Sequence, residues 1–461
     1  MEFVRRQKSK EQRRLDMIFN LYKLFHILCM TFCIVVVWYT HYADDIVSPF
    51  FNRGNYIICA GFAIVYLITV RVYGGFQMGM LKPSELVYSQ FFALIFSDGM
   101  LYGLVCFLAR QLVSAMPMLQ IFIVQLIVSV IWSRVAAKIY NYFTPTKKTV
   151  VLYGNSSARN SISGIFHLEH KFHIMGEILV DSQHVFNAKD IEEADAVFLC
   201  GVRSSYRNAV LKYCVGNNIE AYVRPSIGDL LISNSQRIHM VNTPFLHCTR
   251  NHQNQIYLMS KRLIDIVISL VALVVLSPFM LLTAVVIKAY DGGPVLYRQC
   301  RLTRDGREFN ILKFRSMKVD AESDGVARLA SENDNRVTPI GKFIRMIRFD
   351  ELPQLFNILS GEMSLVGPRP ERPEIAAQYE KQIPEFSLRL QVKAGLTGYA
   401  QIYGRYNTEP YNKLQMDLIY IANQSIIEDL RLLLMTVKVL FMPESTEGVQ
   451  DGQETAKVVI K

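Results

Sequence analysis

Two adjacent acids, Asp350 and Glu351, lie in an arginine-rich stretch of the chain, with Arg345 and Arg348 just before them. A carboxylate can attack phosphorus as a nucleophile and form an acyl phosphate. Mg²⁺ binds through one or two carboxylates together with the phosphates of a substrate. Arginines neutralise the charge that develops on a transferred phosphoryl group. The acid pair and its neighbours therefore indicate phosphoryl chemistry.

The same pair has a plainer interpretation. The run Asp350–Leu359 is predicted to be a helix, and Asp350 would then be its N-cap, with Glu351 and Pro353 in an ordinary first turn. The start of such a helix also favours phosphate. The acid pair by itself leaves both interpretations open.

Two further clusters surround the acids. Residues 313–317 read Lys-Phe-Arg-Ser-Met and follow a strand-like run, and residues 367–370 read Gly-Pro-Arg-Pro. The second cluster is a rigid turn that presents Arg369, or it is a purely structural loop.

Composition narrows the class of protein. Of the 461 residues, 51% are hydrophobic and 20% are charged, whereas soluble chains carry about 25% charge. A disordered chain is excluded, and a purely soluble enzyme is disfavoured. The net charge of +10 suggests anionic lipid or phosphorylated ligands as partners, and no nucleic acid. None of the eight cysteines forms a CxxC pair, so we expect neither a disulfide framework nor a zinc site.

Four long apolar stretches occupy the first third of the chain. Each is near the ~20 residues that a helix needs to cross a bilayer core, which predicts a four-helix transmembrane region. The stretches are Leu24–Thr40, Gly54–Val70, Ser89–Ala109 and Met116–Ser133. Basic residues gather before the first and after the fourth, so both ends are expected in the cytoplasm. Asp98 lies inside the third stretch; a helix-packing role is favoured over a functional one.

From Lys147 to about Cys248, short β-branched runs alternate with polar helical runs, which predicts βαβ units and a Rossmann-like domain. The first strand leads into Gly154, the only glycine present where a dinucleotide fingerprint needs three. Asp181 follows the second strand, where a ribose-binding acid would lie. We expect no bound cofactor here, although a weak nucleotide site stays open. The strand candidates are Thr149–Tyr153, Glu177–Val180, Ala196–Cys200 and Ala221–Val223.

A fifth apolar stretch, Ile266–Ile287, has basic residues on both sides, so both of its ends are expected on the cytoplasmic side. Ser277 and Pro278 lie at its centre, and a proline can bend a helix sharply. We therefore predict a re-entrant helix that enters one leaflet and returns. The alternative is an ordinary fifth span with a mild kink.

These features together resemble the bacterial sugar transferases, also called polyprenyl-phosphate hexose-1-phosphate transferases or monotopic phosphoglycosyl transferases. The resemblance covers about Ser260–Phe441, and the earlier spans and Rossmann-like domain match the family's long-form members. It rests on the blocks KRLIDIVISL, SPFMLLTAVVIK, GPVLYRQCRLTRDGREFNILKFRSM, RVTPIGKFIRMIRFDELPQLFNILSGEMSLVGPRP and VKAGLTGYAQIYGR.

The resemblance implies roles for particular residues. Asp350 matches the family's nucleophile, and Glu351 matches the second acid, which would hold Mg²⁺ together with Asp350 or handle a proton. The remaining matches are Arg345 and Arg369 to arginines that hold phosphates, Lys313 and Arg315 to a basic pair, and Ser277 and Pro278 to the break of the re-entrant helix.

The implied reaction transfers a hexose 1-phosphate from a UDP-sugar to polyprenyl phosphate, as undecaprenyl phosphate, and releases UMP through a phosphosugar–aspartyl intermediate. It would begin the repeat units of capsule, exopolysaccharide or O-antigen. The expected enzyme is a multi-pass protein of the bacterial inner membrane, in contact with the lipid bilayer, with its catalytic domain on the cytoplasmic face. A homodimer is plausible.

The expected fold class combines three parts. Residues 1–146 form a membrane α-helical bundle, 147–248 an α/β Rossmann-like cytoplasmic domain, and 249–461 an α+β monotopic phosphoglycosyl transferase domain with a re-entrant helix over 263–288. One departure from the family pattern concerns residues 393–399, which read Lys-Ala-Gly-Leu-Thr-Gly-Tyr where the family has Lys-Pro-Gly-Leu-Thr-Gly-Trp. This change bears on the choice of sugar.

Three other functions compete with this expectation. A non-catalytic membrane regulator with a nucleotide-sensing Rossmann-like domain is the main alternative, but both acids of the dyad are present. A transporter is disfavoured because paired repeats are missing. A nucleotide-sugar dehydratase would need a fuller glycine fingerprint and a Tyr-x-x-x-Lys base in the middle domain.

Overall fold

The computed structural model describes residues 2–50, 53–160, 162, 171–181, 184–233, 235–250, 254–318, 336–404 and 408–440, with side chains from residue 13 onward. The chain forms two compact units, Met1–Pro225 and Ser226–Lys461. Each unit is considered by itself below.

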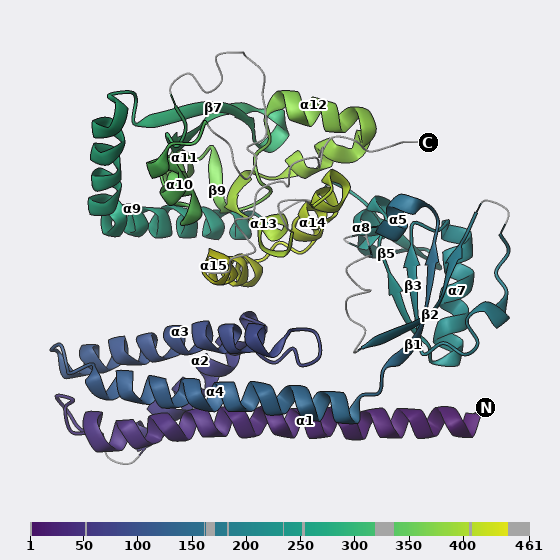
Figure 1. Cartoon of the computed structure of the whole chain (residues 1–461), viewed down its shortest axis with the longest axis horizontal. Coiled ribbons are helices and arrows are strands. Elements are labelled where there is room, and N and C mark those ends of the chain that lie inside the picture. The colour runs from purple at the N-terminus through teal and green to yellow at the C-terminus, as the bar shows by residue number, and fades with distance from the viewer. Residues whose placement is uncertain are drawn as a thin grey trace. The chain divides into compact units, whose positions relative to one another are not determined.

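The first unit begins with a bundle of long apolar helices (Figure 1). Each helix packs against the next, and the first also packs against the fourth. All four are long and apolar enough to cross a membrane, which agrees with the four predicted spans. They are α1 (Glu2–Val37, continued by a π-helical turn over Trp38–Tyr42), α2 (Arg53–Val72), α3 (Pro83–Ala109) and α4 (Met116–Phe143).

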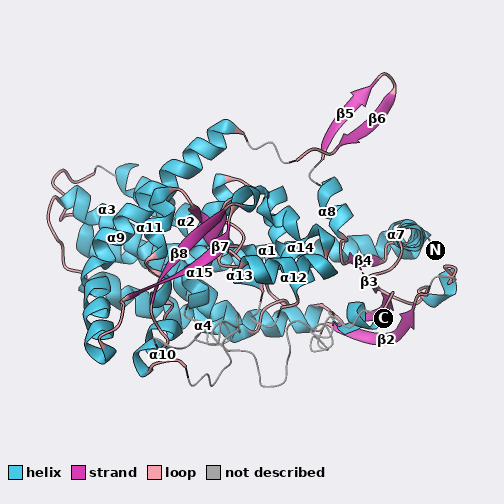
Figure 2. Ribbon diagram, turned by 90° about the horizontal axis from the view of Figure 1, so that it is seen from above, coloured by secondary structure: helices cyan, strands magenta, loops and turns pink. Residues whose placement is uncertain are grey.

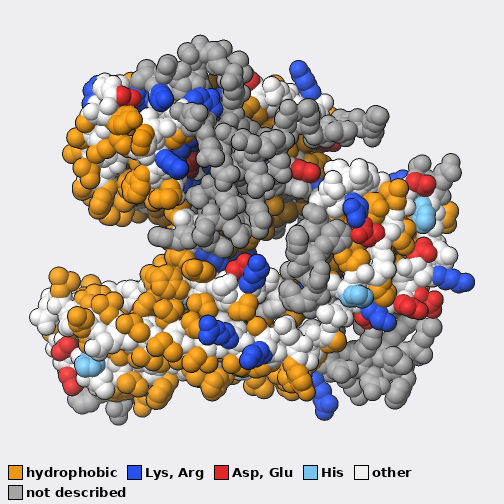
Figure 3. Space-filling view, in the orientation of Figure 1, with side chains coloured by type: hydrophobic (Ala, Val, Ile, Leu, Met, Phe, Trp, Pro, Cys, Tyr) orange, Lys and Arg blue, Asp and Glu red, His pale blue; other side chains and the backbone are white. Residues whose placement is uncertain are grey.

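The bundle has an apolar exterior and several polar contacts inside. Hydrophobic side chains cover the visible face of these helices in Figure 3. Between the helices, His26 Nε2 lies 2.9 Å from Tyr66 Oη, and Thr69 Oγ1 lies 3.0 Å from Ser97 Oγ. Asp98 is also buried there. Polar side chains between apolar helices are typical of helix association in lipid.

The α/β part of the first unit contains a four-stranded parallel sheet in the order β2-β1-β3-β4. Its elements are β1 (Lys147–Tyr153), α5 (Ser156–Asn160), β2 (Phe172–Leu179), a 3₁₀ turn (Ala188–Asp190), β3 (Ala196–Cys200), α7 (Ser204–Asn217) and β4 (Glu220–Val223). All four predicted strands are present. However, β2 begins five residues earlier than expected. Exposed residues alternate with less exposed ones along β2, so one face of the strand is exposed. A strand of this kind contains no continuous β-branched run, and its first residues were therefore not predicted.

Gly154 has a packing role at the end of β1. A Cβ atom at this position would overlap the carbonyl oxygen of Gly201, which follows β3. The glycine therefore allows the ends of two adjacent strands to approach closely, and it does not need a bound pyrophosphate to explain it.

The second unit contains, among its helices, a small parallel sheet of β9 and β10 and two antiparallel hairpins, one of β5 and β6 and one of β7 and β8, which run side by side in Figure 2. In chain order it comprises α8 (Ile227–Ser233), β5 (Gln236–Met240), β6 (Thr243–His247), α9 (Gln255–Asp291), β7 (Leu296–Leu302), a 3₁₀ turn (Arg304–Gly306), β8 (Glu308–Phe314), α10 (Pro339–Met346), a 3₁₀ turn (Phe349–Glu351), α11 (Gln354–Ser360), β9 (Met363–Val366), α12 (Pro373–Gln382), a 3₁₀ segment (Pro384–Gln391), β10 (Ala394–Thr397), α13 (Tyr399–Tyr403), α14 (Pro410–Ala422) and α15 (Ile426–Leu440).

Helix α8 belongs to the second unit although the sequence placed residues up to 248 in the Rossmann-like domain. Ile227 and Leu230 are buried in the same apolar core as Leu414 and Leu418 of α14. The division between the units therefore falls before Ser226. The apolar face of this short helix packs against the second unit. The order of strands and helices along the sequence does not predict this packing.

Helix α9 contains the fifth apolar stretch. Figure 1 shows it as two arms that meet at a sharp bend, and Pro278 lies inside the helix. Pro278 has no amide hydrogen to donate, and the hydroxyl of the preceding Ser277 donates to the Val274 carbonyl at 2.8 Å. Along the helix, large apolar side chains are exposed. Within the part of the chain that the structure describes, five helices are long and apolar enough to cross a membrane, and α9 is the most apolar of them.

Candidate active site

The acid pair lies in a short 3₁₀ turn between α10 and α11. The turn, Phe349–Glu351, follows Arg348, whose φ of 52° is in the left-handed region. Helix α11 begins only at Gln354, and its N-cap is Pro353, which makes no side-chain cap. The sequence prediction that a helix starts at Asp350 is therefore wrong, and Asp350 is not its N-cap. The left-handed residue turns the chain before the acids, so they precede the helix.

Two basic side chains converge on Glu351. Lys313 Nζ, from β8, donates to Glu351 Oε1 at 3.0 Å, and Arg369 Nη2, from the loop after β9, donates to the same oxygen at 2.9 Å. The Glu351 side chain is 13% exposed. Three segments that are distant in the sequence thus meet at one carboxylate.

Asp350 is different, because it is buried but unpaired. Its exposed fraction is 9%, and its carboxylate makes no hydrogen bond or ion pair with another residue that the structure describes. Burial raises the pKa of Asp350, as does the neighbouring charge of Glu351, while Lys313, Arg345 and Arg369 act in the opposite direction.

The pKa of Glu351 moves the other way. Burial alone would raise it, but the positive charges of Lys313, Arg369 and Arg348 outweigh burial and hold the pKa of Glu351 below its usual range. Glu351 is therefore held in its charged form by its basic partners, whereas the Asp350 carboxylate has no such partner among the described residues. Environments that separate the pKa values of two neighbouring acids are typical of acid pairs with distinct roles.

The structure separates the remaining predicted residues. Arg345 Nε donates to Ser316 Oγ at 2.7 Å, and its charge also acts on Asp350. Arg315 instead forms an ion pair with Asp291 at the end of α9. Ser277 and Pro278 lie within α9 and shape that helix. The acid pair is thus brought together with Lys313 and Arg369, and with Arg345 through its charge.

Sequence reasoning missed the residues that hold α11 behind the acids. Asn357 accepts from the Leu312 amide at 3.0 Å and donates to the Asn310 carbonyl at 2.9 Å, which ties α11 to β8. At the other end of α11, Arg262 of α9 donates to the carbonyls of Ile358 and Leu359. The only sequence signal for these roles was their place within the family's blocks.

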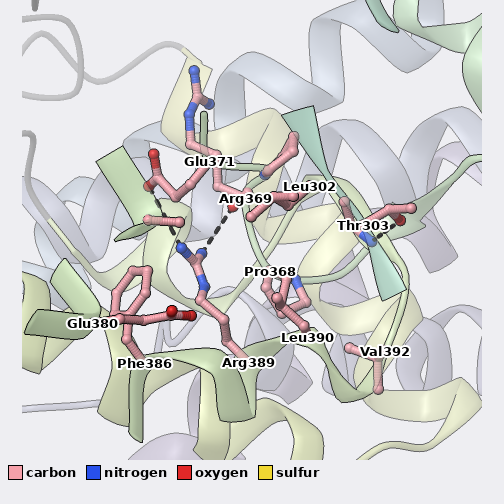
Figure 4. Close-up of a pocket in the computed structure, with 13 residues that line it drawn as sticks. Leu302, Thr303, Pro368, Arg369, Glu371, Glu380, Phe386, Arg389, Leu390 and Val392 are labelled. Carbon is pink, nitrogen blue, oxygen red and sulfur yellow. Dashed lines mark hydrogen bonds and ion pairs between the residues drawn. The ribbon is translucent and has the colours of Figure 1, made fainter. Parts of the chain in front are cut away.

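Sequence reasoning also missed Arg389 and Glu371, which lie behind the Arg369 loop. These residues help to line a cavity of about 10 Å³, which is room for roughly one water molecule. Figure 4 shows the guanidinium of Arg389 directed at the main-chain oxygen of Arg369 and at the carboxylate of Glu371. Burial raises the pKa of Asp417, the other partner of Arg389, to about 6, although Arg389 opposes this shift.

The donor set is compatible with a magnesium ion that substrate phosphates help to hold. Among the residues that the structure describes, no group of three or more histidine, cysteine, aspartate or glutamate side chains could bind a metal without such help. Asp350 offers an unpaired carboxylate next to Glu351. One or two carboxylates completed by phosphate oxygens and water is the usual set for Mg²⁺.

Comparison with known proteins matches the second unit. A model of the bacterial sugar transferase family matches residues 256–443. The UDP-glucose:undecaprenyl-phosphate glucose-1-phosphate transferase of Caulobacter vibrioides is 40% identical over 190 residues, which are 40% of this chain and 71% of that protein. The chain belongs to the bacterial sugar transferase family. The resemblance seen in the sequence is thereby confirmed.

Other members of the family differ in the sugar that they are named for. The UDP-N-acetylgalactosamine-undecaprenyl-phosphate N-acetylgalactosaminephosphotransferase of Aeromonas hydrophila is 40% identical over 200 residues, 41% of this chain and 47% of the relative. A UDP-glucose:undecaprenyl-phosphate glucose-1-phosphate transferase of Klebsiella pneumoniae is 44% identical over 189 residues, 40% of each chain. The match thus spans less than half of the length of these two relatives.

Proposed function

We propose that this protein transfers a sugar 1-phosphate from a UDP-hexose to polyprenyl phosphate, as undecaprenyl phosphate, and releases UMP. The observation that carries the proposal is the acid pair, in which a buried, unpaired Asp350 adjoins a Glu351 held by Lys313 and Arg369. The names of the relatives support the same reaction class.

The proposed chemistry has two displacements at one phosphorus. A carboxylate oxygen of ionised Asp350 attacks the sugar-side phosphorus of the UDP-sugar, the bond to the bridging oxygen breaks, and UMP leaves. An oxygen of polyprenyl phosphate then attacks the same phosphorus, and the bond to Asp350 breaks. The products are polyprenyl-diphosphate sugar and the restored carboxylate, so atoms and charge balance.

The remaining residues of the site act on charge and position. Arg369 is 44% exposed, so its guanidinium can contact a phosphate while it also bonds Glu351. Lys313 and Arg345 lower the pKa of Asp350 and so favour the ionised nucleophile. Asp350 and Glu351 would hold Mg²⁺, and its positive charge would neutralise charge on the diphosphate.

We infer that the enzyme works at the cytoplasmic surface of the bacterial inner membrane. The bend of α9, its basic flanks and its exposed apolar side chains support a re-entrant helix rather than a fifth span. UDP-sugars are cytosolic and the acceptor is a lipid, so the acids must lie at the boundary of the two phases. Large apolar side chains of α15, Ile427, Leu430 and Val437, are exposed and would lie in the same interface.

The α/β part of the first unit is proposed to be a Rossmann-like domain. Its parallel strands and their order support this assignment. A homodimer, and a role in starting capsule, exopolysaccharide or O-antigen repeat units, remain part of the proposal through the family alone.

The test is UMP release by the purified full-length protein with Mg²⁺, undecaprenyl phosphate and a panel of UDP-sugars. We expect release with one donor, and none from the Asp350→Asn variant. Absence of release with every donor from a folded, lipid-supplied protein would refute the transferase and favour the membrane regulator. Equal release from Asp350→Asn would place the nucleophile elsewhere.

A further inference from the structure

Backbone pairing holds only part of the loop that carries Arg369. Pro368 and Pro370 flank the arginine and have no amide hydrogen to donate. On the β10 side, the loop is held by two backbone bonds, Gly367 N to Thr397 O and Gly395 N to Pro368 O, both at 2.9 Å. The carbonyls of Arg369 and Pro370 are left for other donors.

A buried arginine, Arg389, and a partly buried one, Arg301, supply those donors. Arg389 Nη2 donates to the Arg369 carbonyl at 2.8 Å, and Arg301 Nη1 donates to the Pro370 carbonyl at 3.0 Å. The side chain of Arg369 points away from Arg389 in Figure 4 and reaches Glu351. The main chain of Arg369 is therefore held by Arg389 on one side, while the Arg369 guanidinium contacts Glu351 on the other side.

Arg389 is itself anchored from a distant helix. Its Nη2 lies 2.8 Å from Asp417 Oδ2 of α14, its Nη1 lies 3.5 Å from Glu371, and the exposed fractions of Arg389 and Asp417 are 4% and 1%. The guanidinium also lies over the ring of Phe386, 4.9 Å from its centroid. A buried ion pair is a weak source of stability when compared with apolar packing, so stability alone does not account for this arrangement.

We propose that Arg389, anchored by Asp417, is a positioning residue that sets Arg369 against Glu351 for the reaction. This inference rests on the proposed function. The planar guanidinium can address the loop carbonyl and two carboxylates together, whereas the ammonium of lysine lacks this fixed geometry. A misplacement of about 1 Å at a site that orients substrate can lower the rate roughly a hundredfold.

The test is a double-mutant cycle in the UMP-release assay with full-length protein in lipid. Arg389→Lys and Arg369→Ala are each expected to lower kcat, the first by roughly ten- to a hundredfold. If Arg389 acts through Arg369, adding Arg389→Lys to Arg369→Ala costs little more, because the group being positioned is already gone. A purely structural arginine would lower the rate by the same factor in both backgrounds.

A matched pair of variants separates positioning from stability and covers the case in which Arg389→Lys does not fold. Asp417 and Asp429 are both buried and both form an ion pair, the latter with Lys261 at 2.7 Å. Asp417→Asn and Asp429→Asn should both lower the unfolding temperature, but only Asp417→Asn should lower kcat.

Equal loss of kcat in the two asparagine variants, or independent effects in the cycle, would overturn the positioning role while wild-type release still supports the transferase. A folded wild-type protein without UMP release would overturn both.

Discussion

Replacing Lys313 with methionine tests the electrostatics of the acid pair. Lys313 Nζ lies 3.0 Å from Glu351 Oε1, and the two side chains are 19% and 13% exposed. At an effective dielectric constant of about 20, two unit charges at this distance attract each other by about 5.5 kcal/mol before the cost of desolvation. Breaking a buried pair by removing one partner typically costs about 3–5 kcal/mol. Because Arg369 still contacts the same oxygen, we expect the unfolding free energy to fall by about 3 kcal/mol, the lower end of that range.

The same substitution should change the pH dependence of the reaction. Lys313 lowers the pKa of both acids, so its removal raises both. Attack requires ionised Asp350, and the rate is therefore lost as pH falls through the pKa of this residue. The acid limb of the pH–rate profile should move to higher pH. The pKa of Glu351 is depressed in the folded protein, so Glu351 contributes stability at pH values above its unfolded-state pKa, and this stability is lost as pH falls. The Lys313→Met variant should lose part of this contribution at all pH values above the unfolded-state pKa.

The assay is single-turnover UMP release across pH, with thermal unfolding measured on the same samples. Arg315→Met is the matched control, because Arg315 pairs with Asp291 rather than with the acids. It should lower stability without moving the acid limb. If Lys313→Met left the limb in place, or if both variants moved it equally, the assignment of Lys313 to the acid pair would be wrong.

Three further outcomes are expected. Chelation of divalent ions with EDTA should stop UMP release, and added Mg²⁺ should restore it; release that persists in EDTA would remove the metal from the reaction. Arg262→Met should lower the unfolding free energy by about 1–3 kcal/mol, because the carbonyls of Ile358 and Leu359 lose their donors; chemical denaturation in detergent measures this, and an unchanged midpoint would contradict it. Gly367→Ala should reduce UMP release, since the added Cβ would overlap the carbonyl oxygen of Lys393 and displace the loop that carries Arg369; activity equal to wild type would show that the loop tolerates the shift.

The sequence predicted the elements whose pattern is local. Long apolar stretches gave the helices of the bundle, and the apolar run at Ala196–Cys200 is a strand buried along its whole length. The start of α11 was misplaced because Asp-Glu-Leu-Pro has the composition of a helix N-terminus. The position of the acids before the helix depends on the left-handed conformation of Arg348. An arginine does not predict that conformation from its residue type.

The residues of the candidate site were predicted from the sequence, but their geometry only in part. Lys313 and Arg315 are two residues apart, so strand alternation would place them on one face. However, β8 ends at Phe314, and Arg315 beyond it turns to Asp291 instead. Arg389 and Asp417 come from separate segments and form no short motif, so only the folded chain shows that they meet.

The position of α8 matters for anyone who wishes to produce the second unit alone. A truncated protein that starts at residue 249 lacks Ile227 and Leu230, which are 7% and 8% exposed in the intact chain. It would leave an apolar hole beside Leu414 and Leu418 of α14, open to water and to other copies. Such a fragment should aggregate or be cleaved by proteases more readily than one that starts at Ser226.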